Sequence, residues 1–386
     1  MIVNRYNIGF ASLVAGLSFA LMSSFTACVD EYVPHDIEQL RGLLVVDGII
    51  SDGQTSIKLS RSVGLTDNFD GDEFVNNAKV QVEREDGSVY PCKLYNDRGE
   101  YMVDMGKLDM DNRYRLRISL DGKEYESAYL RPISTPQIDS ISLRKDNTAG
   151  EIHLCVSTHN TPDESKYYRW IYKENWEVKA EIFMAAERIG ERVVIYDLQT
   201  ANNYHYCWGK DSSKVMSLAG SDKLTENVIS NKSLASYPPH DRRFSILYHV
   251  DVTQYALRRE AYDYYSNLQK NIEESGGLFA PIPSEMKGNI ICVSDPETHV
   301  IGYVEVACAT NMSRFMPEIK DYYTPEQTGC ASTIVQGWEY EKNPDYGYVS
   351  YNPLNMESNV YALRKCMNCE LYGSKSKPSW WPTPHL

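Results

Sequence analysis

The sequence predicts a mainly β protein: an N-terminal immunoglobulin-like or transthyretin-like β-sandwich, then a second, larger β domain that carries one long amphipathic helix. Three observations predict this class. Short apolar runs alternate with polar residues at a period of two, Asp-Gly dipeptides separate paired runs, and one long segment has helical periodicity. The chain has 386 residues, more than one hydrophobic core usually serves, so two domains are expected.

The chain opens with the features of a secretory signal peptide over residues 1–27. Arg5 precedes an apolar stretch over 8–22, and small residues lead up to Ala27, directly before Cys28. The stretch is too short for a bilayer span, which takes about 20 apolar residues. A cysteine at the cleavage site favours a lipoprotein in which Cys28 becomes the first mature residue and carries lipid. The alternative is a plainly secreted chain.

Residues 28–41 are polar and predict a short tether. Loss of the signal peptide removes the charge of Arg5 and changes the net charge from −14 to about −15. Nucleic-acid binding needs clustered Lys and Arg, so this acidic chain is not expected to bind nucleic acid. An acidic chain is not drawn to an anionic membrane either, so the lipid would have to hold it there.

The first domain is expected over 42–134. The hairpin dipeptides Asp86-Gly87 and Asp121-Gly122 separate runs with period-two alternation, and Pro132 and Pro136 mark the boundary that follows. Seven short strands in about 90 residues are typical of a β-sandwich. The predicted strands cover residues 43–50, 55–60, 78–84, 89–95, 101–104, 114–120 and 124–131.

The second domain is expected over 135–386. Leu257, Ala261, Tyr264 and Leu268 recur at three- and four-residue steps and predict a helix over 253–275, which Gly276-Gly277 would stop. We expect its apolar stripe to pack on the second domain; a partner-binding face is the alternative. Residues from 317 on predict a loop-rich tail. The predicted strands cover residues 138–143, 151–157, 167–182, 193–196, 204–208, 244–251, 288–293 and 300–307.

Motifs of known chemistry do not occur in the chain. It has no Gly-x-Ser-x-Gly, His-Glu-x-x-His, phosphate-loop or dinucleotide pattern, so an enzyme is not expected, nor a metal or cofactor. Glycosidases can place two carboxylates on distant strands without a local signature, so a surface hydrolase acting on glycan or peptide stays an alternative.

Eight cysteines remain besides Cys28 and allow 105 disulfide connectivities, among which the sequence cannot choose. Cys366 and Cys369 form a Cys-x-x-Cys pair in the tail, which predicts structural disulfides, with Cys330 as the nearest upstream partner candidate. Zinc would need two further ligands, and redox chemistry would need a helix start in a βαβ unit. The strand-like runs around three other cysteines predict buried thiols: Cys155, Cys292 and Cys308.

Two further segments invite binding hypotheses. Asp67, Asp70, Asp72 and Glu73 surround a glycine; their order does not match a calcium loop, so a solvated acidic loop is expected, and it is a candidate ligand loop. The aromatic run over 167–176 predicts a core strand, with a sugar-stacking platform as the alternative.

The chain resembles an uncharacterised family of Bacteroidota outer-membrane lipoproteins, classed as a domain of unknown function and typically encoded beside TonB-dependent receptors. Ser379 and Trp380 depart from the family pattern, where an acidic residue and a Phe are expected. The resemblance rests on the order of the segments 44–48, 57–60, 167–170, 207–208, 260–265, 287–290, 300–303, 366–369 and 377–381.

The resemblance implies a protein lipid-anchored in the outer membrane, facing the cell exterior, that works as an accessory of a TonB-dependent β-barrel receptor. Asp30 and Glu31, just after Cys28, fit the acidic signal for surface export in such groups. We therefore expect non-catalytic capture of a ligand or nutrient. A surface hydrolase and an adhesin or envelope scaffold are the alternatives.

Overall fold

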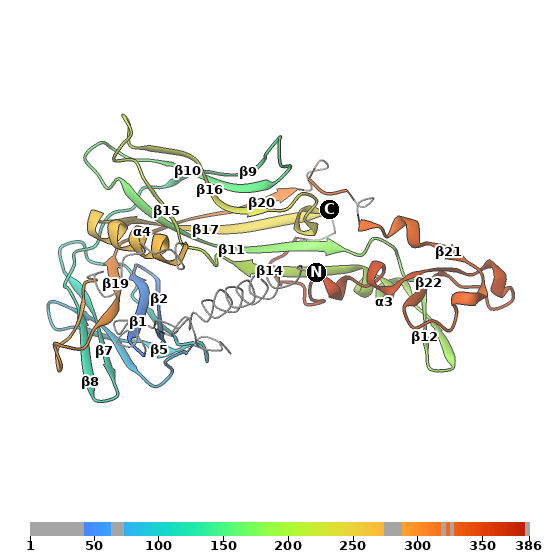
Figure 1. Ribbon diagram of the computed structural model, residues 1–386, viewed down its shortest axis with the longest axis horizontal. Coiled ribbons are helices and arrows are strands. Elements are labelled where there is room, and N and C mark those ends of the chain that lie inside the picture. Colours follow the sequence, from blue (N-terminus) through green and yellow to red (C-terminus); the bar gives the residue numbers. More distant parts are fainter. Residues whose placement is uncertain (1–41, 63–72, 274–287, 318–321, 325–327, 383–386) are drawn as a thin grey trace, which may run out of the picture.

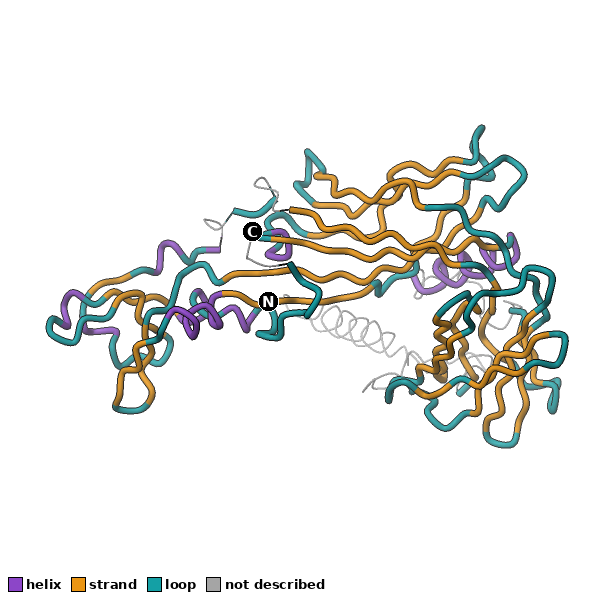
Figure 2. Tube along the Cα trace, turned by 180° about the vertical axis from the view of Figure 1, so that it is seen from behind, coloured by secondary structure: helices purple, strands orange, loops and turns teal. Residues whose placement is uncertain are grey.

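The computed structural model describes residues 42–62, 73–273, 288–317, 322–324 and 328–382. These residues form an elongated, mainly β molecule, as predicted, in which three modules follow one another along the long axis (Figures 1 and 2). The predicted signal peptide, Cys28 and the tether lie outside the described residues. No helix within the described ranges is long and apolar enough to cross a membrane.

The first module, here called the first sandwich, consists of two five-stranded sheets, ordered β19-β1-β2-β6-β5 and β18-β8-β7-β3-β4. The period-two pattern builds it: in β7 every second side chain, from Tyr114 to Leu120, is buried between the sheets. Its early strands are β1 (Leu44–Ile50), β2 (Gln54–Arg61), β3 (Lys79–Arg84), β4 (Val89–Pro91), β5 (Lys93–Leu94), β6 (Glu100–Asp104), β7 (Tyr114–Leu120) and β8 (Lys123–Ser127).

The predicted strand over 89–95 is in fact two strands in different sheets. β4 pairs with β3, whereas β5 pairs with β6 in the facing sheet. Between them the N–H of Cys92 still bonds the carbonyl of Val80, at 2.9 Å. A strand that changes sheets in this way closes one corner of a sandwich.

Two strands of the first sandwich come from far along the chain. β19 (Val300–Val306) pairs in parallel with β1 over seven residues, from Leu44 opposite Val300 to Ile50 opposite Val306, and β18 (Ile290–Cys292) pairs with β8. From the sequence, both runs are expected in the second domain, and that assignment is wrong. Parallel neighbours need a long crossover, and here the crossover is the whole central module. The first sandwich is therefore built from two separate chain segments.

The central module, here called the central sandwich, packs a three-stranded sheet (β16-β10-β9) on a longer one (β14-β11-β17-β20), whose β11 also pairs with β15. Tyr168, Trp170 and Val250 are buried between the sheets, so the aromatic run is a core strand as predicted. The strands are β9 (Ile138–Lys145), β10 (Ile152–His159), β11 (Tyr167–Lys179), β14 (Tyr206–Ser212), β15 (Ser217–Gly220), β16 (Val228–Tyr237), β17 (Leu247–Leu257) and β20 (Ala309–Pro317).

The long helix α4 (Arg259–Glu273) begins six residues later than predicted. The predicted start at 253 is wrong because β17 continues to Leu257, with Gln254 and Ala256 in the core of the sandwich. Ala261 and Tyr265 of α4 lie in one buried apolar cluster with Leu257 of β17 and Tyr303 of β19. The apolar stripe therefore fills the junction between the two sandwiches. The predicted stop at Gly276-Gly277 lies outside the described residues.

The third module, here called the distal module, is a five-stranded sheet ordered β13-β12-β22-β23-β21 with the helix α3 beside it. α3 (Leu198–His205) was not predicted; Asp197 caps it by accepting a hydrogen bond from the N–H of Thr200. The strands are β12 (Ala186–Ile189), β13 (Arg192–Ile195), β21 (Val335–Gln336), β22 (Tyr346–Ser350) and β23 (Val360–Leu363), and 3₁₀ turns cover Ala331–Thr333, Trp338–Tyr340, Met356–Ser358, Arg364–Cys366 and Cys369–Leu371. The predicted loop-rich tail thus supplies three strands of this sheet.

Candidate functional site on the open face of the central sheet

The long sheet of the central sandwich has one face in the core and one face that the three-stranded sheet does not cover. Strand register sets rows of neighbours across this second face. One row holds Lys210, Asn175, His249 and Phe315; the next holds Ser212, Lys173, Asp251 and Ser313; the third holds Ile171, Thr253 and Asn311. Apart from the buried His249, these side chains are half-buried or exposed. We call these eleven residues the open strip.

The C-terminal tail closes one end of the open strip. Trp381 packs on Ile246 and Leu247, and its Nε1 donates to Oε2 of the buried Glu177, at 3.0 Å. This contact places the neighbouring Trp380 over the strip, with its ring centroid 4.7 Å from that of His249 and 6.0 Å from that of Phe315.

The first sandwich closes the other end. Arg169, one row beyond Ile171, donates from Nη1 and Nη2 to the carboxylate of Asp47 on β1, at 2.9 and 3.2 Å. Nearby, the N–H of Ala309 donates to Asp52 of the first sandwich, at 2.6 Å. The C-terminal tail and the first sandwich thus fix the two ends of the strip, so its side chains are arranged before any ligand binds.

His249 is the most buried side chain of the strip, with 4% of its surface exposed. Its Nε2 lies 2.8 Å from Oγ of Ser313, and its Nδ1 lies 3.8 Å from Oδ2 of Asp251. Burial lowers the pKa of His249, against the smaller opposing effect of Asp251. The three residues have the composition of a nucleophile, base and acid, but at 3.8 Å the carboxylate does not hydrogen-bond Nδ1, which such a triad requires to fix the tautomer.

Two lysines give the strip a local charge opposite to that of the chain. Lys173 and Lys210 are exposed, and neither forms an ion pair with another residue that the structure describes. Asp251 is the one carboxylate among the strip residues. The strip therefore carries a small positive charge in a chain of net charge −14.

The most buried carboxylates of the long sheet and its junction lie in separate places, each with its own donors. Glu174 accepts from Tyr237 (2.8 Å), Tyr248 (2.6 Å) and Arg243 (2.6 Å) inside the sandwich core. Glu177 faces the opposite side of β11 because it is three residues further along the strand. Glu305, on β19, is held by Arg258 at the junction with the first sandwich. No two of these three carboxylates therefore face one common site, as the two carboxylates of a glycosidase would.

The structure forms two disulfides, Cys330–Cys366 and Cys207–Cys369. The Cys-x-x-Cys pair is therefore split between two partners, and it joins the distal module to β14. Cys330 is the partner candidate named from the sequence. Cys207 was missed because it lies 162 residues before its partner and no spacing pattern connects them. Four of the cysteines that the structure describes are free: Cys155 and Cys292 are buried as predicted, whereas Cys92 and Cys308 are half-buried, so the prediction of a buried thiol is wrong for Cys308.

The acidic loop and Cys28 are mostly beyond what the structure describes. Asp67, Asp70 and Asp72 lie outside the described residues. Glu73 is exposed, and its carbonyl accepts the N–H of Arg61, at 2.8 Å. Within the described ranges no group of three or more His, Cys, Asp or Glu could hold a metal ion.

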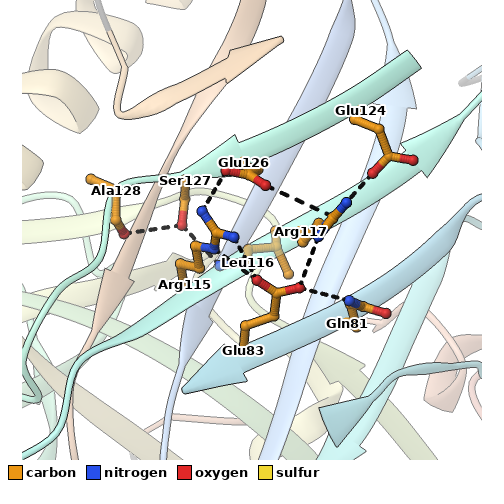
Figure 3. Close-up of polar contacts among 9 residues, drawn as sticks. All are labelled: Gln81, Glu83, Arg115, Leu116, Arg117, Glu124, Glu126, Ser127 and Ala128. Carbon is orange, nitrogen blue, oxygen red and sulfur yellow. Dashed lines mark hydrogen bonds and ion pairs between the residues drawn. The ribbon is translucent and has the colours of Figure 1, made fainter. Parts of the chain in front are cut away.

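The outer face of the first sandwich carries a charged ladder across β3, β7 and β8 (Figure 3). Arg115 bonds Glu83 and Glu126, and Arg117 bonds Glu83 at 3.4 Å and Glu124 at 3.1 Å. Burial raises the pKa of Glu83, but hydrogen bonds from Arg115 and Gln81 outweigh it and lower that pKa below its usual value. Each charged side chain of this ladder already has an ion-pair partner, whereas Lys173 and Lys210 of the open strip form no ion pair with a described residue, so the strip is the better candidate for a charged ligand.

Large exposed apolar side chains gather on the distal module. β13 is an edge strand of its sheet, and Ile195 at its end is 63% exposed. Exposed apolar surface of this kind is typical of a site for another protein. The large apolar side chains exposed on the described part of this module are Phe183, Ile189, Val194, Ile195, Leu198, Ile334, Trp338, Leu354 and Leu371.

The fold and the strip define a class of multi-module β-sandwich proteins with an exposed, preformed sheet face. The chain belongs to the DUF4249 family, a domain of unknown function, whose sequence model matches residues 30–313. The match covers the first and central sandwiches. No curated protein matches the chain.

Among solved structures, a DUF4785 family protein from Legionella pneumophila subsp. pneumophila str. Philadelphia 1 is similar at 10% sequence identity, with a TM-score of 0.15. The similarity covers 50% of this chain and 54% of the Legionella chain. The chain thus spans about half the length of that protein.

Proposed function

We propose that this protein is a non-catalytic, lipid-anchored outer-membrane protein facing the cell exterior, which captures a ligand for a TonB-dependent β-barrel transporter. The observation that carries the binding role is the open strip. It is a mostly polar sheet face whose ends the C-terminal tail and the first sandwich hold in place. Aromatic rings lie at one end, and no carboxylate hydrogen-bonds Nδ1 of its histidine.

The N-terminal cysteine, the family resemblance and the distal module support the rest of the proposal. A lipid on Cys28 would attach the chain ahead of the first sandwich, and the resemblance to lipoproteins encoded beside such receptors names the partner class. The apolar surface of the distal module, with the edge strand β13, supports a protein partner, because a free edge strand with exposed apolar side chains can pair with a strand of another chain.

The experiment is co-purification from outer membranes solubilised in mild detergent, with the full chain tagged at its C-terminus. We expect mass spectrometry to find a TonB-dependent barrel enriched over an unrelated tagged lipoprotein. The variant Ile189→Asp/Ile195→Asp should lose the barrel, because charges on this apolar hairpin oppose docking.

The matched control is Leu94→Asp, which places the same charge on an exposed apolar site of the first sandwich. This control should retain the barrel. If no barrel is enriched with the unaltered chain, the proposal is wrong. If both variants retain it equally, the distal module is not the docking surface.

A further inference from the structure

We propose that the open strip binds an anionic glycan, with Trp380 and Phe315 stacking on sugar rings and Lys173 and Lys210 contacting its acid groups. This inference rests on the proposed function, from which it takes the role of ligand capture. It adds the chemical class of the ligand.

The aromatic end of the strip supplies the stacking surface. Trp380 is 50% exposed and Phe315 38% exposed, although their neighbour Trp381 is buried. The buried His249 supports both rings from below, with centroids 4.7 and 4.4 Å away. Rings that stay exposed yet fixed present an apolar face at low entropic cost, and the C–H faces of sugar rings stack on such surfaces.

The middle of the strip supplies hydrogen bonds suited to a ligand rich in hydroxyl groups. Ser212, Ser313, Thr253, Asn175 and Asn311 have hydroxyl or amide side chains, which both donate and accept. Thr253 donates to Oδ1 of Asn311 at 2.6 Å, which orients that amide and leaves its NH₂ group to donate to a ligand.

The charge of the strip selects the anionic members of this class. Lys173 and Lys210 lie on the neighbouring strands β11 and β14, and neither has an ion-pair partner among the described side chains. Although an acidic protein repels anions at long range, two lysines without an ion-pair partner on the same sheet face as the aromatic rings complement a ligand that carries carboxylate or sulfate groups.

The size of the strip fits an oligomer. Lys210 and Phe315 lie in the same row on the outer strands of the sheet, three strand spacings or about 14 Å apart. A single small ring could not contact both ends, whereas an extended polysaccharide could.

The test is biolayer interferometry with the full lipidated chain captured in detergent. The probes are polygalacturonate, which carries carboxylates, heparin, which also carries sulfates, neutral dextran, and poly-L-glutamate. We expect polygalacturonate or heparin to bind at least tenfold more tightly than dextran and poly-L-glutamate, and to bind more weakly as salt rises. Binding of polygalacturonate would indicate recognition of carboxylates, whereas binding of heparin alone would indicate recognition of sulfates.

Two variants should each weaken that binding at least tenfold: Trp380→Ala and Lys173→Ala/Lys210→Ala. The lysine pair is exposed, so this variant is expected to fold even if the tail is disturbed by loss of Trp380. The matched controls Trp338→Ala and Lys93→Ala remove an exposed Trp and an exposed Lys elsewhere and should bind as the unaltered chain does.

Three results would overturn the inference: no probe binds, dextran binds as tightly as the anionic glycans, or poly-L-glutamate binds as tightly with Trp380→Ala unaffected. The last result would assign the strip to acidic polypeptides. A barrel that co-purifies while no glycan binds removes this inference alone, whereas glycan binding without a barrel removes the transporter partnership alone.

Discussion

Arg169 of the central sandwich and Asp47 of the first sandwich form a two-bond ion pair that joins the modules at one end of the open strip. The guanidinium of Arg169 is buried and also lies over the ring of Tyr265 in α4, 4.9 Å from its centroid. Burial raises the pKa of Asp47, but the charge of Arg169 outweighs it and lowers that pKa below its usual value. The pair therefore contributes to stability while Asp47 is ionised.

The first prediction concerns this ion pair and its dependence on pH. Asp47→Asn should lower the free energy of unfolding by about 1 kcal/mol at pH 7, because the buried Arg169 keeps its charge without its carboxylate partner, whereas water already screens the half-exposed Asp47. Since the folded pKa of Asp47 is lowered, the difference should be full above the unfolded pKa of about 3.9 and should disappear as pH falls through the folded pKa. Urea unfolding at pH 7 and pH 3 measures it; equal differences at both would contradict the prediction.

The second prediction concerns Glu305, whose side chain is fully buried at the module junction. Burial raises its pKa, although Arg258 bonds it through its backbone N–H and its guanidinium. Arg258→Ala should cost about 3–5 kcal/mol at pH 7, because a buried carboxylate is left without its cation. The loss should shrink at acid pH, where Glu305 becomes protonated. The double variant Arg258→Ala/Glu305→Gln should regain part of the stability; if it is no more stable than Arg258→Ala, the charge is not the cause.

The third prediction concerns the disulfide Cys207–Cys369. Its removal as Cys207→Ala/Cys369→Ala should lower the free energy of unfolding by about 2–4 kcal/mol. It should also expose the tail after residue 369 to protease, because this bond joins the tail to β14. Limited proteolysis read by mass spectrometry checks this. Cys308→Ala, which removes a free and half-buried thiol, is the control and should be cleaved as the unaltered chain is.

The fourth prediction separates binding from hydrolysis at Ser313. If the serine were a nucleophile, Ser313→Ala would abolish turnover of an activated ester such as p-nitrophenyl acetate. We expect the variant and the unaltered chain to give the same background rate, because His249 lacks the hydrogen bond to Asp251 that would fix its tautomer. A saturable rate that disappears in the variant would contradict the prediction and assign esterase chemistry to Ser313.

The fifth prediction concerns attachment. The chain with Cys28→Ser should appear in the soluble fraction of lysed cells, and the unaltered chain in the outer-membrane fraction, because stable anchoring depends on the acyl chains. Immunoblotting of both fractions measures this. Membrane association of the serine variant would contradict lipid anchoring.

Local patterns in the sequence predicted the elements that depend on local physics. The alternation in residues 114–120 and the turn at Asp121-Gly122 appear in the structure as β7 and its hairpin with β8, because side-chain period and turn chemistry are set within a few residues. The predicted start of α4 was wrong because the local pattern over residues 253–257 fits a helical period as well as a strand period. The pairing of β17 with β20 makes this segment a strand.

Features that depend on distant pairing had no local signal. The partner of Cys369 and the return of β19 to β1 are set by the complete fold, across 162 residues in the first case. The sequence did not predict the open strip either, because Lys173, His249 and Ser313 lie on three different strands and become neighbours only through the register of the sheet.

The parallel pairing of β1 with β19 has a consequence for folding during synthesis. β1 lies inside its sheet, so until residue 306 has left the ribosome one side of it presents unpaired backbone groups. The N-terminal module then cannot finish folding before the middle of the chain has emerged, and such non-local closure is slow and prone to aggregation. A holdase chaperone that shields this strand until β19 is available would therefore raise the yield of folded protein.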